Sequence, residues 1–277
     1  MTAHYEQEIE LESERRFEFG KNWRRFLSTL DEERIEEAEK SLLSMLEVET
    51  LSGRSFLDIG SGSGLFSLAA RRLGARVRSF DYDTQSVACA QELKGRFFAG
   101  DSDWTIERGS VLDADYIKSL GQFDIVYSWG VLHHTGAMWR ALEHASLPVS
   151  VGGRLFVAIY NDQAQKSQFW RSVKRFYCSG AVGKTFVPVL FIPYFLAGGF
   201  AKDMLRGRSP LARFKEYKKE RGMSIVHDWI DWLGGYPFEV ARPEEIFDFY
   251  RARGFTLDKL LTCGGGLGNN QFVFTRR

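Results

Sequence analysis

Three glycines and two aspartates in the first half of the chain have types and spacing suited to holding a nucleotide-like cofactor. Gly60, Gly62 and Gly64 lie between two apolar runs, in the segment LDIGSGSGLFSLAA. Residues without Cβ allow a sharp turn and let a large ligand approach backbone N–H groups closely. Asp81 follows Asp58 by 23 residues, where an acidic side chain can accept both ribose hydroxyl hydrogens. A tight turn alone would explain the glycines, but the addition of Asp81 favours a cofactor site.

Histidines supply the candidate bases. His133 and His134 end the segment FDIVYSWGVLHH, and His227 stands beside Asp228 in IVHDWIDWLGGYPFE. Imidazole suits proton removal near neutral pH, so we expect one of the three histidines to act as a general base. Packing beneath a helix would account for each ring equally well, and that alternative stays open.

Polar and aromatic residues near the same predicted strand ends are candidates for binding an acceptor. Tyr160, Asn161 and Asp162 follow the apolar segment GGRLFVAIY, although a turn at a strand end also favours Asn and Asp. Trp129 and Trp139 flank the two adjacent histidines. They are candidates for the wall of a cofactor or acceptor pocket, and aromatic core packing is the alternative.

Strand-like and helix-like segments alternate over the middle of the chain. SFLDIG, ARVRSFDYD, WTIERGSVLD, FDIVYSWGVLHH and GGRLFVAIY have strand character, and helical patterns separate them. Near the end, FTLDKLLTC and NNQFVFTRR are joined by the glycine-rich GGGLG. We therefore predict an α/β fold, a Rossmann-like doubly wound sheet of seven strands with a C-terminal antiparallel hairpin.

The pattern divides the chain into four parts. We predict an N-terminal helical cap over residues 1–50, a cofactor-binding core over 51–160, an insertion over 161–236, and the last helix and hairpin over 237–277. The insertion is rich in aromatic and basic residues. Its segment FVPVLFIPYFLAGGF is apolar but interrupted by Pro188 and Pro193, and we expect it to be too short to span a membrane.

We expect the insertion to be a lid that recognises the acceptor. Lys174, Arg175, Arg206 and Arg208 are candidates for a basic rim that meets an acidic acceptor or an anionic lipid surface. A homodimer interface would use the same apolar residues. Peripheral membrane contact and dimer formation therefore both remain open.

Composition gives weaker constraints. The 277 residues carry a net charge of +1, which gives no strong signal for nucleic-acid binding. Three widely spaced cysteines, Cys89, Cys178 and Cys263, argue against a disulfide framework or a structural zinc site. The acidic N-terminus lacks the pattern of a signal peptide, and a cytoplasmic location is expected.

The motif LDIGSGSG resembles the first motif of class I S-adenosylmethionine-dependent methyltransferases, commonly D-x-G-x-G-x-G. SFDYD, RGSVLD, FDIVYSWGVLHH, VGGRLFVAIY and the terminal hairpin match that family in order. Within the family, the chain looks like the subgroup related to the ubiquinone-biosynthesis O-methyltransferases. The resemblance implies that S-adenosylmethionine is the cofactor.

The resemblance also assigns parts of the site. It implies that the glycine turn passes the methionine part of the cofactor, that Asp81 holds its ribose, and that Ser110 with Val111 borders its adenine. The family often has Asp where this chain has Ser110, and Asp113 is a substitute. His133 replaces a Glu of some relatives, which argues against a magnesium-dependent mechanism, so we assign no metal site. The predicted cofactor-binding set is Asp58, Gly60, Ser61, Gly62, Gly64, Asp81, Tyr82, Ser110, Val111, Ser128 and Trp129.

The first interpretation is a methyltransferase that methylates a hydroxyl group of a small molecule, an aromatic or prenylated phenol or a sugar. One alternative is a methyltransferase acting on tRNA or protein, for which the basic insertion would bind the macromolecule. Another is a module that binds the cofactor without turnover.

Overall fold

The computed structural model describes residues 17, 23, 26–28, 30–205, 207 and 225–277. Arg206, Arg208 and most of the first 25 residues of the predicted N-terminal cap lie outside this part of the chain. A seven-stranded sheet forms the centre, in the order β3-β2-β1-β4-β5-β7-β6. The strands are β1 (Ser55–Ile59), β2 (Arg76–Asp81), β3 (Trp104–Arg108), β4 (Phe123–Trp129), β5 (Val149–Tyr160), β6 (Phe255–Leu261) and β7 (Asn269–Arg276).

Strand direction confirms the predicted fold class. The first five strands run parallel, whereas β7 lies antiparallel to both β5 and β6. The order in which the strands are added to the sheet reverses between β1 and β4, and in doubly wound sheets ligands bind outside the carboxyl ends of the strands at such a switch point. The fold therefore places the glycine turn after β1 at the expected ligand-binding edge.

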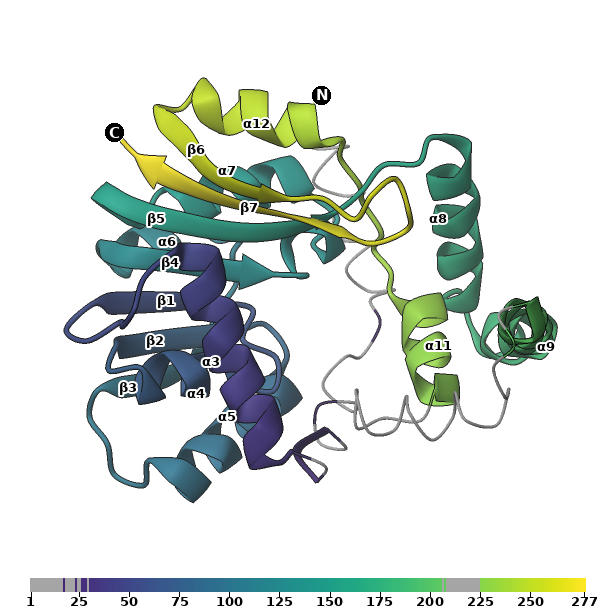
Figure 1. The fold of residues 1–277 in the computed structure, drawn as a ribbon, viewed down its shortest axis with the longest axis horizontal. Coiled ribbons are helices and arrows are strands. Elements are labelled where there is room, and N and C mark those ends of the chain that lie inside the picture. Colours follow the sequence, from purple (N-terminus) through teal and green to yellow (C-terminus); the bar gives the residue numbers. More distant parts are fainter. Residues whose placement is uncertain (1–16, 18–22, 24–25, 29, 206, 208–224) are drawn as a thin grey trace.

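Helices cover both faces of the sheet (Figure 1). Alternate residues of each strand supply the two cores: Phe56 and Tyr127 point to one face, and Leu57 and Val126 to the other. On the first face lie α3 (Glu32–Leu46), α4 (Leu65–Arg72) and α5 (Thr84–Phe97). On the second lie α6 (Ala114–Ser119), α7 (Met138–Ser146) and α12 (Pro243–Arg251).

The chain between β5 and α12 forms a separate helical layer beyond the carboxyl ends of the strands (Figure 1). A hydrophobic cluster rich in aromatic residues, which includes Trp170, Leu233 and Phe238, holds this layer together. Its described helices are α8 (Gln165–Tyr177), α9 (Ala181–Leu205) and α11 (Ile225–Gly234).

Helix α9 corrects one sequence-based expectation. The apolar segment is part of a continuous helix of 25 residues that includes Pro188 and Pro193, and this helix is long and apolar enough to cross a membrane. A proline inside a helix removes one backbone hydrogen bond and bends the helix. We had expected the two prolines to interrupt the helix, and this expectation was wrong.

Gly64 provides a test of how tightly the core is packed. It has a φ of +82°, and a Cβ added there would lie 2.9 Å from the Cα of Ala90 on α5. Gly100 has a similar φ of +75° but open space around it. We expect Gly100→Ala to cost about 1–2 kcal/mol from the left-handed backbone alone. Gly64→Ala should cost about 1–3 kcal/mol more, because a backbone must shift. Urea unfolding measures both, and equal losses would contradict the close packing of α4 on α5.

Candidate active site

The turn between β1 and α4 brings the backbone close to the exit of β4. A Cβ at Gly60 would overlap the side chain of Val131, which lies just beyond β4. At Gly62 a Cβ would lie 2.9 Å from the indole of Trp23. Trp23, which the sequence did not single out, therefore lies over the glycine turn. The hydroxyl oxygen of Ser61 in the same turn is buried and has no hydrogen-bond partner among the described residues.

Asp81 lies at the end of β2, next to the glycine turn. One of its carboxylate oxygens accepts a hydrogen bond from the backbone N–H of Gly62, at 2.9 Å. The other accepts from the N–H of Asp83, also at 2.9 Å. These bonds hold an acidic side chain beside the turn, as a site for ribose hydroxyls requires.

Asp58 is buried beneath the same turn. Its Oδ2 accepts a hydrogen bond of 2.5 Å from Ser67 on α4. The pKa of Asp58 is raised to about 7. Burial is the main cause, the hydrogen bond from Ser67 lowers the pKa, and the nearby Asp81 carboxylate adds to the rise. The side chain therefore fastens α4 to β1 and changes charge near neutral pH.

The predicted adenine side is formed by the ends of β2 and β3. The exposed ring of Tyr82 lies under the guanidinium of Arg108, 5.6 Å from its centroid. Ser110 accepts the backbone N–H of Leu112 at 3.2 Å, and Val111 is buried. Asp113 caps α6 by accepting two backbone N–H groups of that helix. Its carboxylate thus has a structural task, which weakens its proposed role as a substitute for Ser110.

Ser128 and Trp129 end β4 with different surroundings. The Ser128 hydroxyl is fully buried and donates to the carbonyl of Ile59 at 3.0 Å, so it ties β4 to β1. The Trp129 ring is exposed, and its indole N–H donates to Gln271 at 3.2 Å. Trp139 is exposed as well and packs on Phe249, 5.2 Å between ring centroids.

His133 and His134 form a 3₁₀ turn beyond β4, with ring centroids 4.5 Å apart. The Nδ1 of His133 lies 3.3 Å from the backbone N–H of Tyr160. An amide N–H can only donate, so Nδ1 accepts and the hydrogen of the neutral ring is on Nε2. That Nε2 is buried and has no hydrogen-bond partner among the described residues. Burial holds the pKa of His133 well below its usual value, and His134 and Lys174 lower it further.

His134 has the opposite tautomer. Its Nδ1 lies 2.6 Å from the carbonyl oxygen of Pro237. A carbonyl can only accept, so Nδ1 carries the hydrogen and Nε2 carries the lone pair. The lone pair of His133 is thus on Nδ1 and accepts the Tyr160 N–H, whereas that of His134 is on Nε2.

The other histidine, His227, lies in α11, but the placement of its side chain is outside what the structure describes.

Tyr160 joins the histidines, whereas Asn161 bonds residues at the start of β7 and in the loop before it, and Asp162 bonds its own turn. The Tyr160 ring lies 4.1 Å from the His133 ring and 5.3 Å from Phe238, measured between centroids. Asn161 accepts a hydrogen bond from Asn270 and donates to Gly266. Asp162 accepts the N–H of Ala164 at 2.9 Å.

Lys174 corrects another expectation. We placed it on an exposed basic rim, but its side chain is fully buried and donates to the carbonyl of Trp232. Its ammonium nitrogen lies 4.4 Å from the Trp232 ring and 5.0 Å from that of Phe238. Burial lowers its pKa to about 7. The spacing of residues along the helix could have predicted this burial, because Lys174 follows Trp170 by four residues and lies on the buried stripe of α8.

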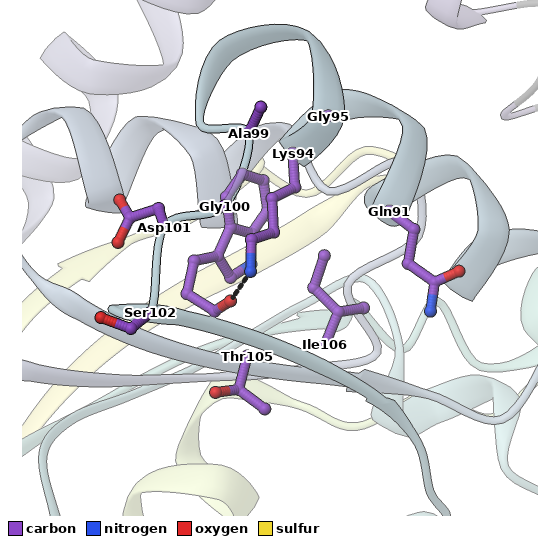
Figure 2. A pocket seen from close by; sticks show the side chains of 10 residues that line it. Gln91, Lys94, Gly95, Ala99, Gly100, Asp101, Ser102, Thr105 and Ile106 are labelled. Carbon is purple, nitrogen blue, oxygen red and sulfur yellow. Dashed lines mark hydrogen bonds between the residues drawn. The ribbon is translucent and has the colours of Figure 1, made fainter.

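Two further features bear on ligand binding. No group of three or more His, Cys, Asp or Glu side chains that could hold a metal ion occurs among the described residues. A hollow of about 450 Å³ lies between the end of α5 and β3, where the ammonium of Lys94 donates to the carbonyl of Trp104 (Figure 2). None of the residues lining it belongs to the predicted site.

The sequence of the core matches a known domain family. Residues 57–157 match the methyltransferase domain family, and this range contains the glycine turn, Asp81 and both adjacent histidines. The core is a class I S-adenosylmethionine-dependent methyltransferase domain. Its cofactor is S-adenosylmethionine.

Relatives of the methyltransferase domain show how far the similarity extends. The chain is 30% identical over 111 residues to a ubiquinone biosynthesis O-methyltransferase of Xanthomonas oryzae, covering 40% of this chain and 45% of that enzyme. It is 47% identical over 51 residues to a ribosomal protein L11 methyltransferase of Pediococcus pentosaceus, covering 18% of this chain and 16% of that one. The chain thus spans less than half the length of these two relatives.

The fold extends over more of the chain than the sequence similarity does. The magnesium protoporphyrin IX methyltransferase of Synechocystis with bound S-adenosylhomocysteine superposes with a TM-score of 0.53 at 15% identity. The superposition covers 88% of this chain and 83% of that one. At this level of identity, the likeness shows the fold alone.

The described side chains of the methyltransferase domain fit the cofactor. The N–H groups of Gly60, Gly62 and Gly64 bond Phe80, Asp81 and Ser61, so the turn is held in shape by the chain itself, and the Asp81 carboxylate is fixed beside it. The buried Ser61 hydroxyl without a partner is a further polar group available to the methionine part. We expect these groups to bind S-adenosylmethionine, and the individual contacts stay predictions.

Substitution of Asp81 tests the cofactor site. We expect Asp81→Asn to weaken S-adenosylmethionine binding by about 1–3 kcal/mol, or about 5- to 150-fold in Kd, because one acceptor for the ribose hydroxyls is lost. Asp258→Asn is a matched control, since Asp258 lies on the edge strand β6 and bonds Thr275. Calorimetry measures both. Unchanged affinity in the Asp81 variant would show that the ribose lies elsewhere.

The raised pKa of Asp58 predicts a pH-dependent stability. The folded pKa of about 7 exceeds the ordinary value of 3.8, so between these values the folded protein binds more protons than the unfolded chain. This contribution to stability is present below pH 4 and is lost as the pH rises to 7. Asp58→Asn removes the titration, so the variant should gain stability relative to wild type between pH 5 and pH 8.

Asp124→Asn is the control for this measurement. Hydrogen bonds from Ser55 hold the pKa of Asp124 below its usual value, so this carboxylate does not titrate between pH 5 and pH 8. Urea unfolding at both pH values gives the comparison. If the difference between Asp58→Asn and wild type is the same at both, Asp58 does not titrate in this window.

Proposed function

We propose that the chain methylates a hydroxyl group of a small molecule, an aromatic or prenylated phenol or a sugar. Similarity to ubiquinone biosynthesis O-methyltransferases over 111 residues supports a hydroxyl acceptor. The orientation of His134 is the observation that carries the proposal. Its Nδ1–H is held by the carbonyl of Pro237, so the lone pair is on Nε2.

The chemistry requires alignment and removal of one proton. When bound, S-adenosylmethionine supplies an electrophilic methyl group on a sulfonium. The hydroxyl of the acceptor loses its proton as its oxygen is methylated, and Nε2 of His134 takes that proton. His133 has the other tautomer, and its Nε2–H is a donor suited to hold an acceptor oxygen.

Aromatic residues support the expected class of acceptor. The rings of Tyr160 and Phe238 lie 5.3 Å apart, beside the two histidines, and the half-buried Tyr160 ring is the one suited to stack against a phenol, with the buried Phe238 ring behind it. The predicted lid would complete such a pocket. α8 and α11 are its nearest helices, because Arg171 of α8 donates to the Phe238 carbonyl and Trp232 of α11 belongs to the same aromatic cluster as Phe238.

The experiment uses S-adenosylmethionine with a labelled methyl group and a panel of phenols, polyprenylated phenols and sugars, read by mass spectrometry. We expect label on a hydroxyl oxygen of one class. His134→Ala should lower kcat by about 10²–10⁴-fold while the affinity for S-adenosylmethionine stays the same, because a general base acts on the chemical step. His133→Ala is the matched comparison within the same turn. It should raise the KM for the acceptor and leave the increase of kcat with pH largely unchanged, because His133 holds the acceptor and does not take the proton.

One result would contradict the proposed acceptor, and another would contradict the role of His134. Label that appears on tRNA or protein would favour the macromolecular alternative, which the short match to a ribosomal protein methyltransferase also raises. Full activity of His134→Ala would mean that alignment alone suffices for an acceptor that is already acidic.

A further inference from the structure

Helix α9 presents two different sides. On one side, Val187 is buried, and Phe191 and Phe195 lie 5.2 and 6.0 Å from the Trp170 ring of α8. The other side is exposed and apolar. Apart from a step of six between Tyr194 and Phe200, its large residues recur at intervals of three or four positions or as neighbours: Val182, Phe186, Val189, Leu190, Tyr194, Phe200, Met204 and Leu205.

The exposed side is unusually apolar for a surface in water. Val182, Val189 and Met204 are 73%, 69% and 74% exposed. Only 11% of the most apolar stretch of α9 is buried. Soluble monomers rarely expose a continuous apolar patch of this kind, and larger patches mark sites of interaction. This side of α9 is therefore a surface that needs a partner.

Charge around α9 indicates which partner. The chain as a whole has a net charge of +1, yet residues 165–221 contain 13 Lys and Arg against three Asp and Glu. Arg175 on α8 and Lys184 on α9 are exposed among the described residues. Seven of the 13 lie in residues 206–221, which follow α9 directly in the sequence.

An anionic lipid bilayer complements both properties. Its acyl boundary takes up apolar side chains, and its phosphates attract Lys and Arg near the surface. A second copy of this chain would bring the same basic segment against itself, and like charges repel. The side of α9 that packs on α8 stays attached to the protein, which fits a helix that lies along the bilayer surface.

We propose that α9 docks the protein on the surface of a bilayer that carries anionic lipids. The exposed apolar side enters the boundary between headgroups and acyl chains, and exposed basic residues of α8 and α9, Arg175 and Lys184 among them, meet the lipid phosphates. The inference does not rest on the identity of the methyl acceptor.

Sedimentation with vesicles tests the proposal. The full chain is mixed with vesicles of phosphatidylcholine and phosphatidylglycerol, or of phosphatidylcholine alone. We expect at least tenfold stronger partitioning to the anionic vesicles and release by 0.5 M salt, roughly the ionic strength at which charges are screened beyond about 4 Å. The double variant V189S/M204S should partition at least tenfold less.

The double variant V151S/L261S is the matched control. Val151 and Leu261 are exposed by 78% and 51% but belong to strands β5 and β6 of the sheet and not to the helical layer. This control should bind vesicles like the wild type, and all three proteins should bind S-adenosylmethionine equally, which shows that they are folded.

Four results would overturn the proposal. They are no sedimentation with anionic vesicles, equal partitioning to neutral ones, retention at high salt as for a spanning helix, or equal loss in both double variants. A fall in mass from dimer to monomer in V189S/M204S, with vesicle binding unchanged, would show that a second copy covers α9.

Discussion

The active edge of this protein depends on one steric constraint, the closeness of the β1–α4 turn to its neighbours. Val131 fills the space where a side chain at Gly60 would lie, and α5 does the same at Gly64. Because the turn has no room for side chains at these positions, only glycine fits them, and the backbone comes close enough to β2 for Gly60 to bond Phe80 and for Gly62 to bond Asp81. The same contact with Val131 fixes the start of the turn that carries His133 and His134. Cofactor side and acceptor side thus share one packing contact.

Burial sets the charge state of the groups around this contact. Asp58 and Lys174 both have a pKa of about 7, one raised and the other lowered by removal from water. His133 is neutral for the same reason. The interior near the site therefore contains side chains that are charged in most proteins but are close to neutral here. A site of this kind strengthens the hydrogen bonds inside it, since little water screens them.

The sequence predicted those features that depend on local pattern. Alternation of strand and helix gave the sheet, and the glycine spacing with Asp81 gave the edge at which a cofactor would bind. Features set by distant contacts were not predictable. The tautomer of His134 depends on Pro237, about a hundred residues later. α9 continues through two prolines and packs Phe191 and Phe195 on Trp170 of α8, a contact that its own local pattern does not show. Lys174 was misplaced because charge was weighed above its position on the buried stripe of α8.

The helical layer leaves the sheet and returns to it at almost the same point. Asn161 pairs with Ala241 in a short parallel bridge, and the N–H of Asp162 bonds the Ala241 carbonyl. The chain between Asn161 and Ala241 is therefore a closed loop on the β-sheet. The entropy cost of closing such a loop grows only slowly with its length. Helices can be lengthened, shortened or exchanged between these two anchor points without disturbing the register of β5. The architecture thus lets the helices that set specificity change during evolution while the catalytic core is kept, provided that Pro237, which holds His134 from within this loop, stays in place.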